Sequence, residues 1–235
     1  MIWKKAVVTS GPTREWIDPV RYISNGSSGI LGFHIANELK SKFAESVTYI
    51  HGPILPEFQK PKHCNSLSVE TTEDMLQKVL EETETADLLI MCAAPVDFKP
   101  ETSSEKKMKK EANPNPVLHL VPNPDILKAL DRHLQSKSKS MLISNSNANA
   151  NSSLIRIGFA AETNDLKDYA LRKLQEKNLD AIVGNIVHKS GKGFGDVDST
   201  LYVYDKLQTE TILGPNDKQT LAEKLVALLS QKFGK

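Results

Sequence analysis

Two kinds of hydrophobic pattern alternate along the chain. Short runs rich in β-branched residues predict strands, and the longer segments between them repeat apolar residues every three or four positions, as in helices with one buried face. Strands that alternate with helices form a mostly parallel sheet with right-handed crossovers. We therefore expect a doubly wound α/β fold with helices on both faces of the sheet. The predicted strands are 6–10, 47–52, 86–94, 117–121, 154–162 and 179–187, and the predicted helices are 29–43, 71–83, 123–134, 164–178 and 217–233.

The remaining segments fit around this sheet in a single domain that spans residues 1–235. The strand-like segments 200–205 and 209–214 are spaced as a β-hairpin. Residues 99–116 are polar, basic and interrupted by prolines, and they directly follow the most apolar strand, so we expect a flexible flap there. Residues 136–153 are rich in Ser and Asn, which predicts a mobile surface loop.

The overall composition argues against some classes of protein. The chain has 30 Lys and Arg against 29 Asp and Glu, a formal net charge of +1, and this balance argues against general binding of nucleic acid or membranes. Its two cysteines, Cys64 and Cys92, lie far apart without a metal-binding spacing, so neither a disulfide framework nor a zinc site is expected. The first residues contain no apolar stretch long enough for a signal peptide or a membrane span, which favours a cytoplasmic protein.

Polar loops follow the predicted strands, and in a parallel sheet such loops meet at the carboxyl edge. The first, SGPTREWIDPVRYISNGSSG (10–29), matches neither the G-x-G-x-x-G pattern nor the G-x-x-x-x-G-K-[ST] pattern. Its Arg14, Arg21 and Asn25 are suited to hold a phosphate or carboxylate near the start of the next helix. The Ser-Ser-Gly segment 27–29 either leaves backbone N–H groups open to the same anion or only caps that helix.

The loop after the central strand, CAAPVDFKP (92–100), is the second candidate. Ala93 and Ala94 let a ligand approach the backbone closely, and Asp97 is suited to bind a base or sugar, although an ordinary turn aspartate accounts for it equally well. The lysine run EKKMKKE (105–111) is either a solvated face or a flap that closes over phosphates. At ~4 Å a lysine–phosphate pair contributes about 1 kcal/mol in water and about 4 at an effective dielectric near 20, so only a closed flap makes these lysines effective.

The third region begins with NPDIL (123–127), where Asn at the N-cap and Pro at the first helical position predict a helix start. Phe159 ends a strand, and it either belongs to the core or packs on a base. Lys173 and Lys177 lie one turn apart on one predicted helix face, where two like charges repel each other. Two acids on the same helix offset that repulsion, so a solvated helix face is the alternative to a phosphate site.

Taken in order, these segments resemble phosphopantothenoylcysteine synthetase, the family that joins cysteine to 4′-phosphopantothenate in coenzyme A synthesis. Single pieces are weak, but the set runs in order over nearly the whole chain. The resemblance is to the bacterial form, which is usually fused to a flavin-dependent decarboxylase, and it implies here a stand-alone synthetase without flavin. The matching segments are SGPTRE, IDPVRYISN, SSG and GF near the start, then CAA with the Asp that follows, the K-KK run, NPDIL, GFAAETND, KNLDAIVGN and GFG.

The resemblance implies a Rossmann-like fold with a small β extension used for dimerisation. It also implies a ligase that is independent of the ATP-grasp fold. In this family CTP activates the pantothenate carboxylate as an acyl-cytidylate and releases pyrophosphate; the amine of L-cysteine then attacks and CMP leaves. The same resemblance implies Mg²⁺ held mainly by nucleotide phosphates, a cytoplasmic homodimer, and possible association with a separate phosphopantothenoylcysteine decarboxylase. The sequence itself identifies no metal ligand.

Residue by residue, the resemblance assigns roles to matching positions. Asn25 is expected to hold the acyl-cytidylate for attack by cysteine, and Lys107 to reach the nucleotide phosphates from the flap, which makes these two the catalytic candidates. Arg21 is expected to reach the phosphopantothenate phosphate from the neighbouring subunit, and it joins Asn25, Ala93 and Ala94 as a substrate-binding residue. The expected nucleotide-binding residues are Ala93, Asp97, Lys107, Pro124, Asp125, Ile126, Leu127, Phe159, Lys173 and Lys177.

Two positions depart from the family pattern. Pro122 stands where the family often has Lys, and Pro95-Val96 replaces a more typical Val-Ala, so both loops have an altered backbone. Three alternatives stay open. The nearest is an ATP-dependent ligase of the eukaryotic kind. The others are an NAD(P)-dependent oxidoreductase on the same fold, which would lack the usual G-x-G-x-x-G loop, and a non-enzymatic nucleotide-binding protein.

Overall fold

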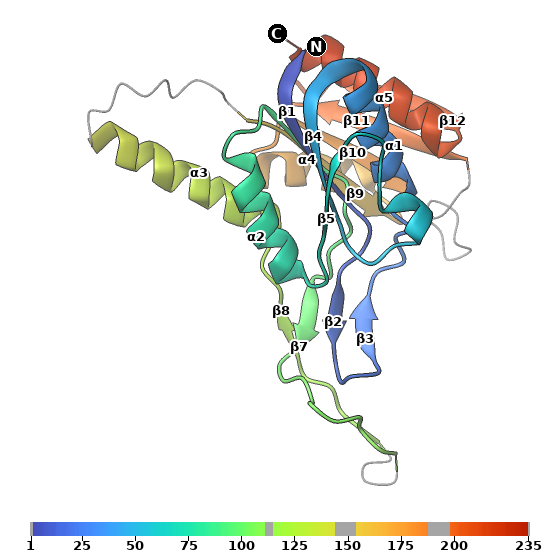
Figure 1. Cartoon of the computed structure of the whole chain (residues 1–235). Helices are drawn as coiled ribbons and strands as arrows, with labels where there is room; N and C mark the ends of the chain where they lie inside the picture. Colours follow the sequence, from blue (N-terminus) through green and yellow to red (C-terminus); the bar gives the residue numbers. More distant parts are fainter. Residues whose placement is uncertain (1, 111–114, 144–153, 188–197, 235) are drawn as a thin grey trace.

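The computed structural model describes residues 2–110, 115–143, 154–187 and 198–234, with the side chains of 140–143 excepted. Their central element is a sheet of parallel strands with an antiparallel hairpin at one side (Figure 1). This confirms the predicted mostly parallel sheet and the hairpin near the end of the chain. In spatial order the strands are β12 (Glu210–Asn216), β11 (Ser199–Asp205), β10 (Ala181–Ile186), β9 (Ile155–Glu162), β6 (Leu88–Met91), β1 (Trp3–Ser10), β4 (Ala44–His51) and β5 (Asn65–Ser68).

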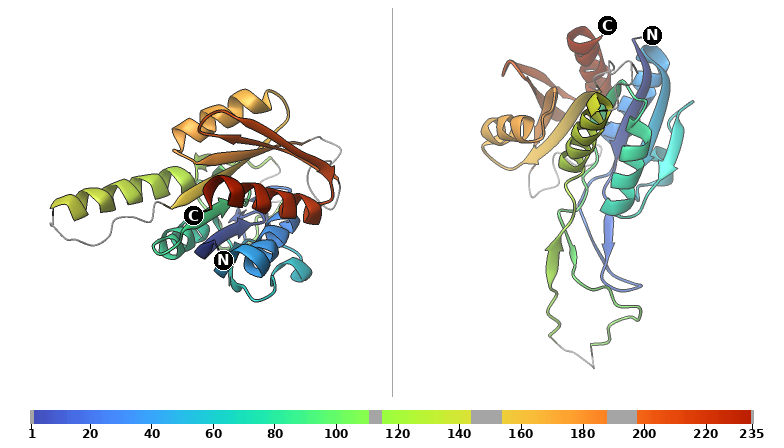
Figure 2. Two further views of the ribbon diagram at one scale, coloured as in Figure 1. Left: turned by 90° about the horizontal axis from the view of Figure 1, so that it is seen from above. Right: turned by 90° about the vertical axis from the view of Figure 1, so that its left-hand side faces the viewer.

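Helices cover both faces of this sheet, as the doubly wound fold requires (Figure 2). One face carries α1 (Ile30–Glu38), which continues as a π-helical turn over Leu39–Phe43, and α5 (Lys218–Phe233). The other face carries α2 (Thr72–Thr83), α3 (Ile126–Ile143) and α4 (Leu166–Glu176). Each face has its own cluster of buried apolar side chains, and burial of this apolar surface is the main driving force for the fold.

The strand order creates a crevice at one defined place. From β1 the chain proceeds to β4 and β5 on one side, and it then returns to β6, β9 and β10 on the other. The connections after the neighbouring strands β1 and β6 therefore diverge, which leaves space beyond their carboxyl ends. Ligands of open parallel sheets bind at such a switch point.

A narrow extension projects from the carboxyl edge of the sheet (Figure 2). It contains two antiparallel hairpins, β2 (Arg14–Trp16) with β3 (Tyr22–Ser24), and β7 (Phe98–Pro100) with β8 (Leu120–Pro122). The two hairpins lie side by side, and the Ser104 amide donates to the carbonyl of Ile17. The predicted strand 117–121 is therefore largely wrong, because the chain pairs only from Leu120, with Pro100 as its partner.

The predicted Ser/Asn-rich loop 136–153 is wrong over residues 136–143, which continue helix α3. The hydroxyls of Ser136 and Ser138 donate to the carbonyls of Arg132 and Leu134 at 2.9 Å each, so these serines are satisfied without leaving the helix. Residues 144–153 lie outside the described part of the chain. So do residues 111–114 of the predicted flap and the GFG segment 193–195.

Both ends of the described chain lie at the edge of the sheet opposite the extension (Figure 1). The Ile2 amide donates to the Phe43 carbonyl at 2.8 Å, and a side-chain carbon added to Gly234 would touch the Ile2 side chain. Across the ranges that the structure describes, we find no helix with the length and apolar character to cross a membrane.

Candidate active site

A cavity of about 300 Å³ opens at the switch point between β1 and β6. The three loops that the sequence analysis grouped by topology all contribute to its wall, together with the first turns of α1 and α3. The lining residues are 27–32, 91–97, 123–127 and 159–161, with Thr72, Lys173, Lys177, Asn185 and Lys218.

Most of the predicted site residues line this cavity. From the loop after β6 these are Ala93, Ala94 and Asp97; from the following segments they are Pro124, Asp125, Ile126, Leu127, Phe159, Lys173 and Lys177. Asn25, Arg21 and Lys107 do not line it within the single chain.

Asn25 lies at the rim of the cavity, just after β3. Its side-chain Nδ2 donates to the carbonyl oxygens of Ala94 at 3.2 Å and Pro95 at 3.0 Å, both of which line the cavity. The neighbouring Ser24 hydroxyl donates to the carbonyl of Thr13 at 2.8 Å, which fixes the end of the hairpin. Asn25 therefore links the extension to the loop where a ligand would bind.

Arg21 lies on the extension and is held there by Asp18. Its Nε and Nη2 donate to the Asp18 Oδ2 at 3.0 and 2.6 Å, and Nη2 also donates to the carbonyl of Met108 at 2.7 Å. Burial would raise the pKa of Asp18, but hydrogen bonds from the amides of Val20 and Met108 and from the Arg21 guanidinium lower that pKa to about 2. Asp18 is thus an anion at neutral pH, and it joins the first hairpin to the flap.

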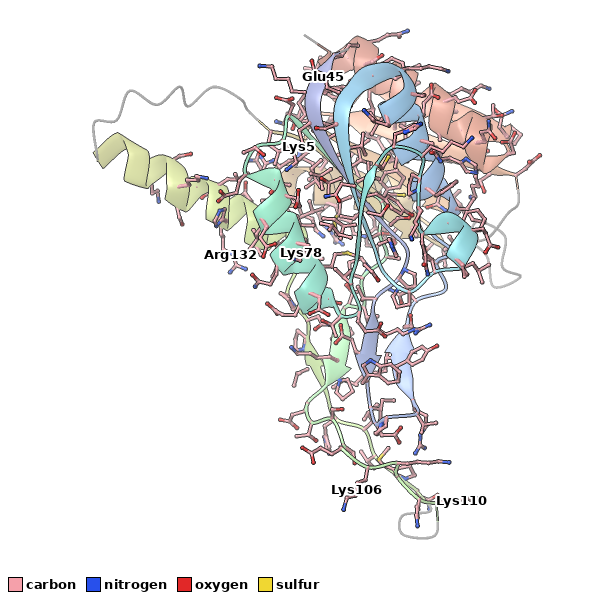
Figure 3. All side chains as sticks on the ribbon, in the orientation of Figure 1. Lys5, Glu45, Lys78, Lys106, Lys110 and Arg132 are labelled. Carbon is pink, nitrogen blue, oxygen red and sulfur yellow. The ribbon has the colours of Figure 1, made fainter. Side chains whose placement is uncertain are left out.

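Lys107 is an exposed residue of the flap, next to Met108. The labelled lysines on either side of it, Lys106 and Lys110, lie at the far end of the extension, away from the sheet (Figure 3). The structure therefore does not bring Lys107 to the cavity of its own chain, and its phosphate-binding role stays a prediction.

The two cavity lysines at the end of α4, Lys173 in its last turn and Lys177 at its C-cap, both have acidic partners. The Lys173 ammonium is 2.7 Å from Glu162, and that of Lys177 is 3.0 Å from Asp125. Both half-buried pairs lie at the cavity wall, where an anionic ligand could replace or share the carboxylate contact. Lys173 and Lys177 therefore do not form a fully solvated helix face, because both residues line the cavity.

The start of α1 faces the same cavity. Its N-cap is Gly29, in a left-handed conformation with φ 77°, and no side chain caps the helix. Of the segment 27–29, Gly29 is thus the N-cap, and neither Ser27 nor Ser28 caps the helix with its side chain. The Ser10 hydroxyl donates to the Gly29 carbonyl at 2.8 Å, and a side-chain carbon at Gly32 would clash with that hydroxyl, so α1 packs closely on β1. An uncapped helix start leaves backbone N–H groups for an anion.

A polar network that the sequence did not reveal fixes the loop after β6. The Thr13 hydroxyl contacts the Thr72 hydroxyl at 2.8 Å and accepts from the Val96 amide at 2.9 Å. The Asn123 Nδ2 donates to the Val96 carbonyl at 2.8 Å, and the Asn123 amide donates to the carbonyl of Asp97. Asn123 is thus not the predicted N-cap, because α3 begins at Ile126 and the Lys128 amide donates to the Asp125 carboxylate. The network holds Asp97 beside the start of α3.

Lys218 is a second feature that the sequence analysis missed. It is the first residue of α5, only 5% exposed, and it lines the cavity. The sequence around Lys218 predicts only the start of a helix. How deeply Lys218 is buried depends on where the preceding hairpin of β11 and β12 ends in the folded chain.

Comparisons with known proteins agree on one family. A sequence model described as "DNA/pantothenate metabolism flavoprotein C-terminal domain" matches residues 1–233. The coenzyme A biosynthesis bifunctional protein CoaBC of Vibrio vulnificus is 33% identical over 232 residues, which cover 98% of this chain and 53% of that protein. The Bacillus subtilis protein of the same name is 37% identical over 204 residues, 86% of this chain and 45% of its own length. The chain spans about half the length of the curated relatives it matches.

Two solved structures have the same fold. The crystal structure of the C-terminal domain of CoaBC has a TM-score of 0.73 and 29% identity, and the match covers 97% of this chain and 95% of that domain. The DNA/pantothenate metabolism flavoprotein from Streptococcus pneumoniae also has a TM-score of 0.73, at 22% identity, with 98% of this chain and 99% of that chain covered. At that identity the second likeness supports the fold alone.

Proposed function

The chain belongs to the family of the DNA/pantothenate metabolism flavoprotein C-terminal domain, and from this premise we propose that it is a CTP-dependent phosphopantothenate–cysteine ligase. One observation carries the proposal. Every nucleotide-binding residue inferred from the resemblance, Lys107 excepted, lines a single cavity at the switch point of the sheet. These residues come from segments far apart in the sequence. A chance match of one short segment to the family would therefore not explain why they line the same cavity.

The proposed reaction has two steps. An oxygen of the 4′-phosphopantothenate carboxylate attacks the α-phosphorus of CTP, the bond to the β-phosphate oxygen breaks, and pyrophosphate leaves. The amine of L-cysteine then attacks the acyl carbon of the acyl-cytidylate, loses a proton, and displaces CMP. Activation is needed because a carboxylate has no adequate leaving group for an amine, and positioning of both reactants lowers the barrier further.

The cavity residues fit these steps. Phe159 and the first turn of α3 are suited to pack on the base, and Asp97 to accept a hydrogen bond from the base or the sugar. Lys173 and Lys177 are suited to neutralise phosphate oxygens. Asn25, at the rim, is suited to orient the acyl group for the incoming amine, because it is bonded to the loop that contains Ala94.

The side chains that line the cavity fit the expected binding of Mg²⁺ with the nucleotide. Asp97 and Asp125 are the carboxylates that line the cavity, and the described residues contain no group of three or more His, Cys, Asp or Glu arranged to hold a metal. One or two carboxylates with nucleotide phosphates are the usual ligands of Mg²⁺ in nucleotide sites. Bound there, the ion would neutralise the phosphate charge, while the chain supplies the lysines around it.

A homodimer is the proposed assembly, and the extension is its proposed interface. The hairpins and the flap expose several large apolar side chains, and exposed apolar surface favours association. In such a dimer, the extension of one subunit would lie over the cavity of the other subunit. Arg21 and Lys107 would then reach the partner's cavity, although they do not reach the cavity of their own chain. The exposed apolar residues there are Val20, Tyr22, Phe98, Met108, Val117, Leu118 and Leu120. A cytoplasmic location is proposed as well, since Cys64 and Cys92 are free thiols.

A stepwise assay tests the proposed function. CTP with 4′-phosphopantothenate should release pyrophosphate, and CMP should appear only when cysteine is added. CTP should support turnover at least about tenfold faster than ATP, a difference of about 1.4 kcal/mol in the barrier. Absence of pyrophosphate release with either nucleotide would contradict the proposal, and faster turnover with ATP would favour the eukaryotic kind of ligase.

A further inference from the structure

We propose that Lys218 is a further substrate-binding residue of the cavity, which holds a phosphate oxygen of the nucleotide beside the amino end of α1. This inference deepens the proposed function and rests on it. The three points that carry it are the place of Lys218 in the fold, its burial, and its position across the sheet from the other cavity lysines.

The topology brings Lys218 to the carboxyl edge of the sheet. Strand β11 runs away from this edge and β12 returns to it, so α5 begins beside the cavity. The Asp217 side chain caps the helix by accepting from the Thr220 amide at 2.9 Å, which fixes where the next residue points. Lys218 is thus positioned by a helix start rather than by a mobile loop.

Lys218 is nine-tenths buried in the cavity wall. The residue is 5% exposed, and its ammonium donates to the hydroxyl of Ser199 at 2.7 Å, in a residue that is itself 8% exposed. Transfer of a lysine charge out of water is unfavourable unless the charge has polar or charged partners. A phosphate oxygen in the cavity would be such a partner, in addition to those that Lys218 has within the chain. Its charge also acts on the cavity lining, since it opposes the effect of burial, which raises the pKa of the Cys92 thiol to about 12.

The cavity lysines approach from opposite faces of the sheet. Lys173 lies in the last turn of α4 and Lys177 directly follows that helix, which packs with α2 and α3 against one face. Lys218 belongs to α5, which packs with α1 against the other face. A ligand that crosses the sheet edge therefore meets positive charge at both sides.

The chemistry of that ligand follows from what lies beside Lys218. The uncapped start of α1, from Gly29 to Gly32, lines the same cavity and presents backbone N–H groups. An ammonium together with helix-start N–H groups is suited to tetrahedral oxyanions such as phosphate. A nucleoside triphosphate has a chain of such groups, and Lys218 and the start of α3 line the same cavity.

Binding measurements with a matched pair of variants test this role. Lys218→Met keeps the unbranched shape and most of the length of the side chain and removes its charge. Lys224→Met makes the same change on an exposed α5 lysine that contacts Asn216 outside the cavity. By calorimetry, Lys218→Met should weaken CTP binding at least about tenfold (1.4 kcal/mol) and leave the binding of cytidine, which has no phosphate, unchanged. Lys224→Met should alter neither affinity.

Further measurements distinguish phosphate binding by Lys218 from a purely structural role. Lys218→Arg should restore most of the CTP affinity, because it returns the charge. Equal CTP affinity for wild type and Lys218→Met would overturn the inference alone, as would a parallel loss of cytidine binding, which would indicate a structural role. If Lys218→Met does not fold, Lys218→Gln takes its place with the same expected loss. Failure of the wild-type chain to bind CTP would overturn the proposed function together with this inference.

Discussion

The side-chain amide of Asn25 donates to the main-chain carbonyl of Pro95, with 3.0 Å between Nδ2 and the oxygen. A second bond from the same nitrogen reaches the carbonyl of Ala94 at 3.2 Å. Asn25 is therefore held by its donor group against the cavity loop, and its position depends on that group being an amide.

Asn25→Asp should leave the nucleotide step largely intact and slow the attack by cysteine about 100-fold, a loss typical for one misplaced polar contact at a reacting centre. A carboxylate would face two carbonyl oxygens with no proton to donate, so the loop and the acyl group beside it would shift. Quenched reactions analysed by mass spectrometry should show accumulated acyl-cytidylate. As control, Asn37→Asp on α1 keeps the Oδ1 that accepts from the Lys62 amide and should not change the rate. Equal loss of both half-reactions, with no acyl-cytidylate formed, would contradict this role.

Lys107→Gln should lower the rate of pyrophosphate release about tenfold or more, because a flap closed over phosphates makes each lysine charge effective. Its melting temperature should match that of the wild type, since Lys107 is exposed and contributes nothing to the core. Lys110→Gln, in the same exposed segment, is the matched variant. Equal losses for both would indicate a dependence on the overall charge of the flap rather than on Lys107.

Asp18→Asn should free the flap from the first hairpin. The variant loses the negative charge that binds Arg21. It also weakens the hydrogen bond that the Met108 amide donates to Oδ2 of residue 18, with 3.2 Å between N and Oδ2 in the wild type. Limited trypsin digestion should then cut faster within residues 106–110, while the core resists as before. A digestion pattern identical to that of the wild type would show that other contacts hold the flap.

The same carboxylate predicts a dependence on pH. The folded-state pKa of Asp18 is about 2, below the ordinary value of 3.8, so its contribution to stability is present above about pH 4. That contribution is lost as the pH falls from about 4 towards 2. When wild type and Asp18→Asn are digested with pepsin side by side at each pH, the flap of the variant should be cut faster near pH 4, and this difference should disappear as the pH falls towards 2.

Gly52→Ala should destabilise the fold by about 1–3 kcal/mol, because its side-chain carbon would overlap the carbonyl oxygen of Pro12. That carbonyl lies in the backbone that bridges to Ala94 at the cavity. Thermal unfolding should show a fall of about 2–12 °C for a chain of this size. Gly26→Ala, where nothing lies within 4 Å of the added carbon, should unfold at the wild-type temperature.

Mixed dimers test whether Arg21 acts on the neighbouring subunit. Arg21→Ala and Asn25→Asp should each be inactive alone. When the two variants are unfolded together and refolded as a mixture, half of the dimers combine one of each, and one of their two sites has both residues intact. About a quarter of the wild-type activity should return. No recovery, with mixed dimers confirmed by differently sized tags, would mean that Arg21 serves its own chain.

The parts of the fold that burial determines were predictable from the sequence. The central strand is apolar on both faces, and its neighbours have the same character, so their pairing as a parallel sheet followed. The hairpin of β2 and β3 was not predictable, because its strands have three residues each and Tyr22 and Ser24 are exposed. The hairpin is held by contacts with distant segments, such as the Thr72 amide that donates to Glu15 and the Ser104 amide that donates to the Ile17 carbonyl, and these contacts have no pattern along the chain.

The residues of the candidate site also fall into two groups, those that the sequence predicts and those that it does not. Asp97 follows a predicted strand and Phe159 lies near the end of another, so the topology alone brings these two to one edge. Lys173 lies inside a predicted helix, and only its spacing from Lys177 and the family resemblance assigned it to the site. Lys218 could not be found, since nothing in a helix-start pattern tells how deeply its first side chain is buried. Asn123 was assigned to the wrong contact, because the choice between capping a helix and bonding to Val96 is made by the packing of two distant loops.

The positions of Ile2 and Gly234 have a practical consequence. Both lie at the edge of the sheet opposite the cavity mouth and the extension. A purification tag or a surface linker attached at either position would point away from the ligand entrance. Protein attached to a sensor chip in this way should present its cavity to the solution, so that nucleotide binding can be recorded on the immobilised chain.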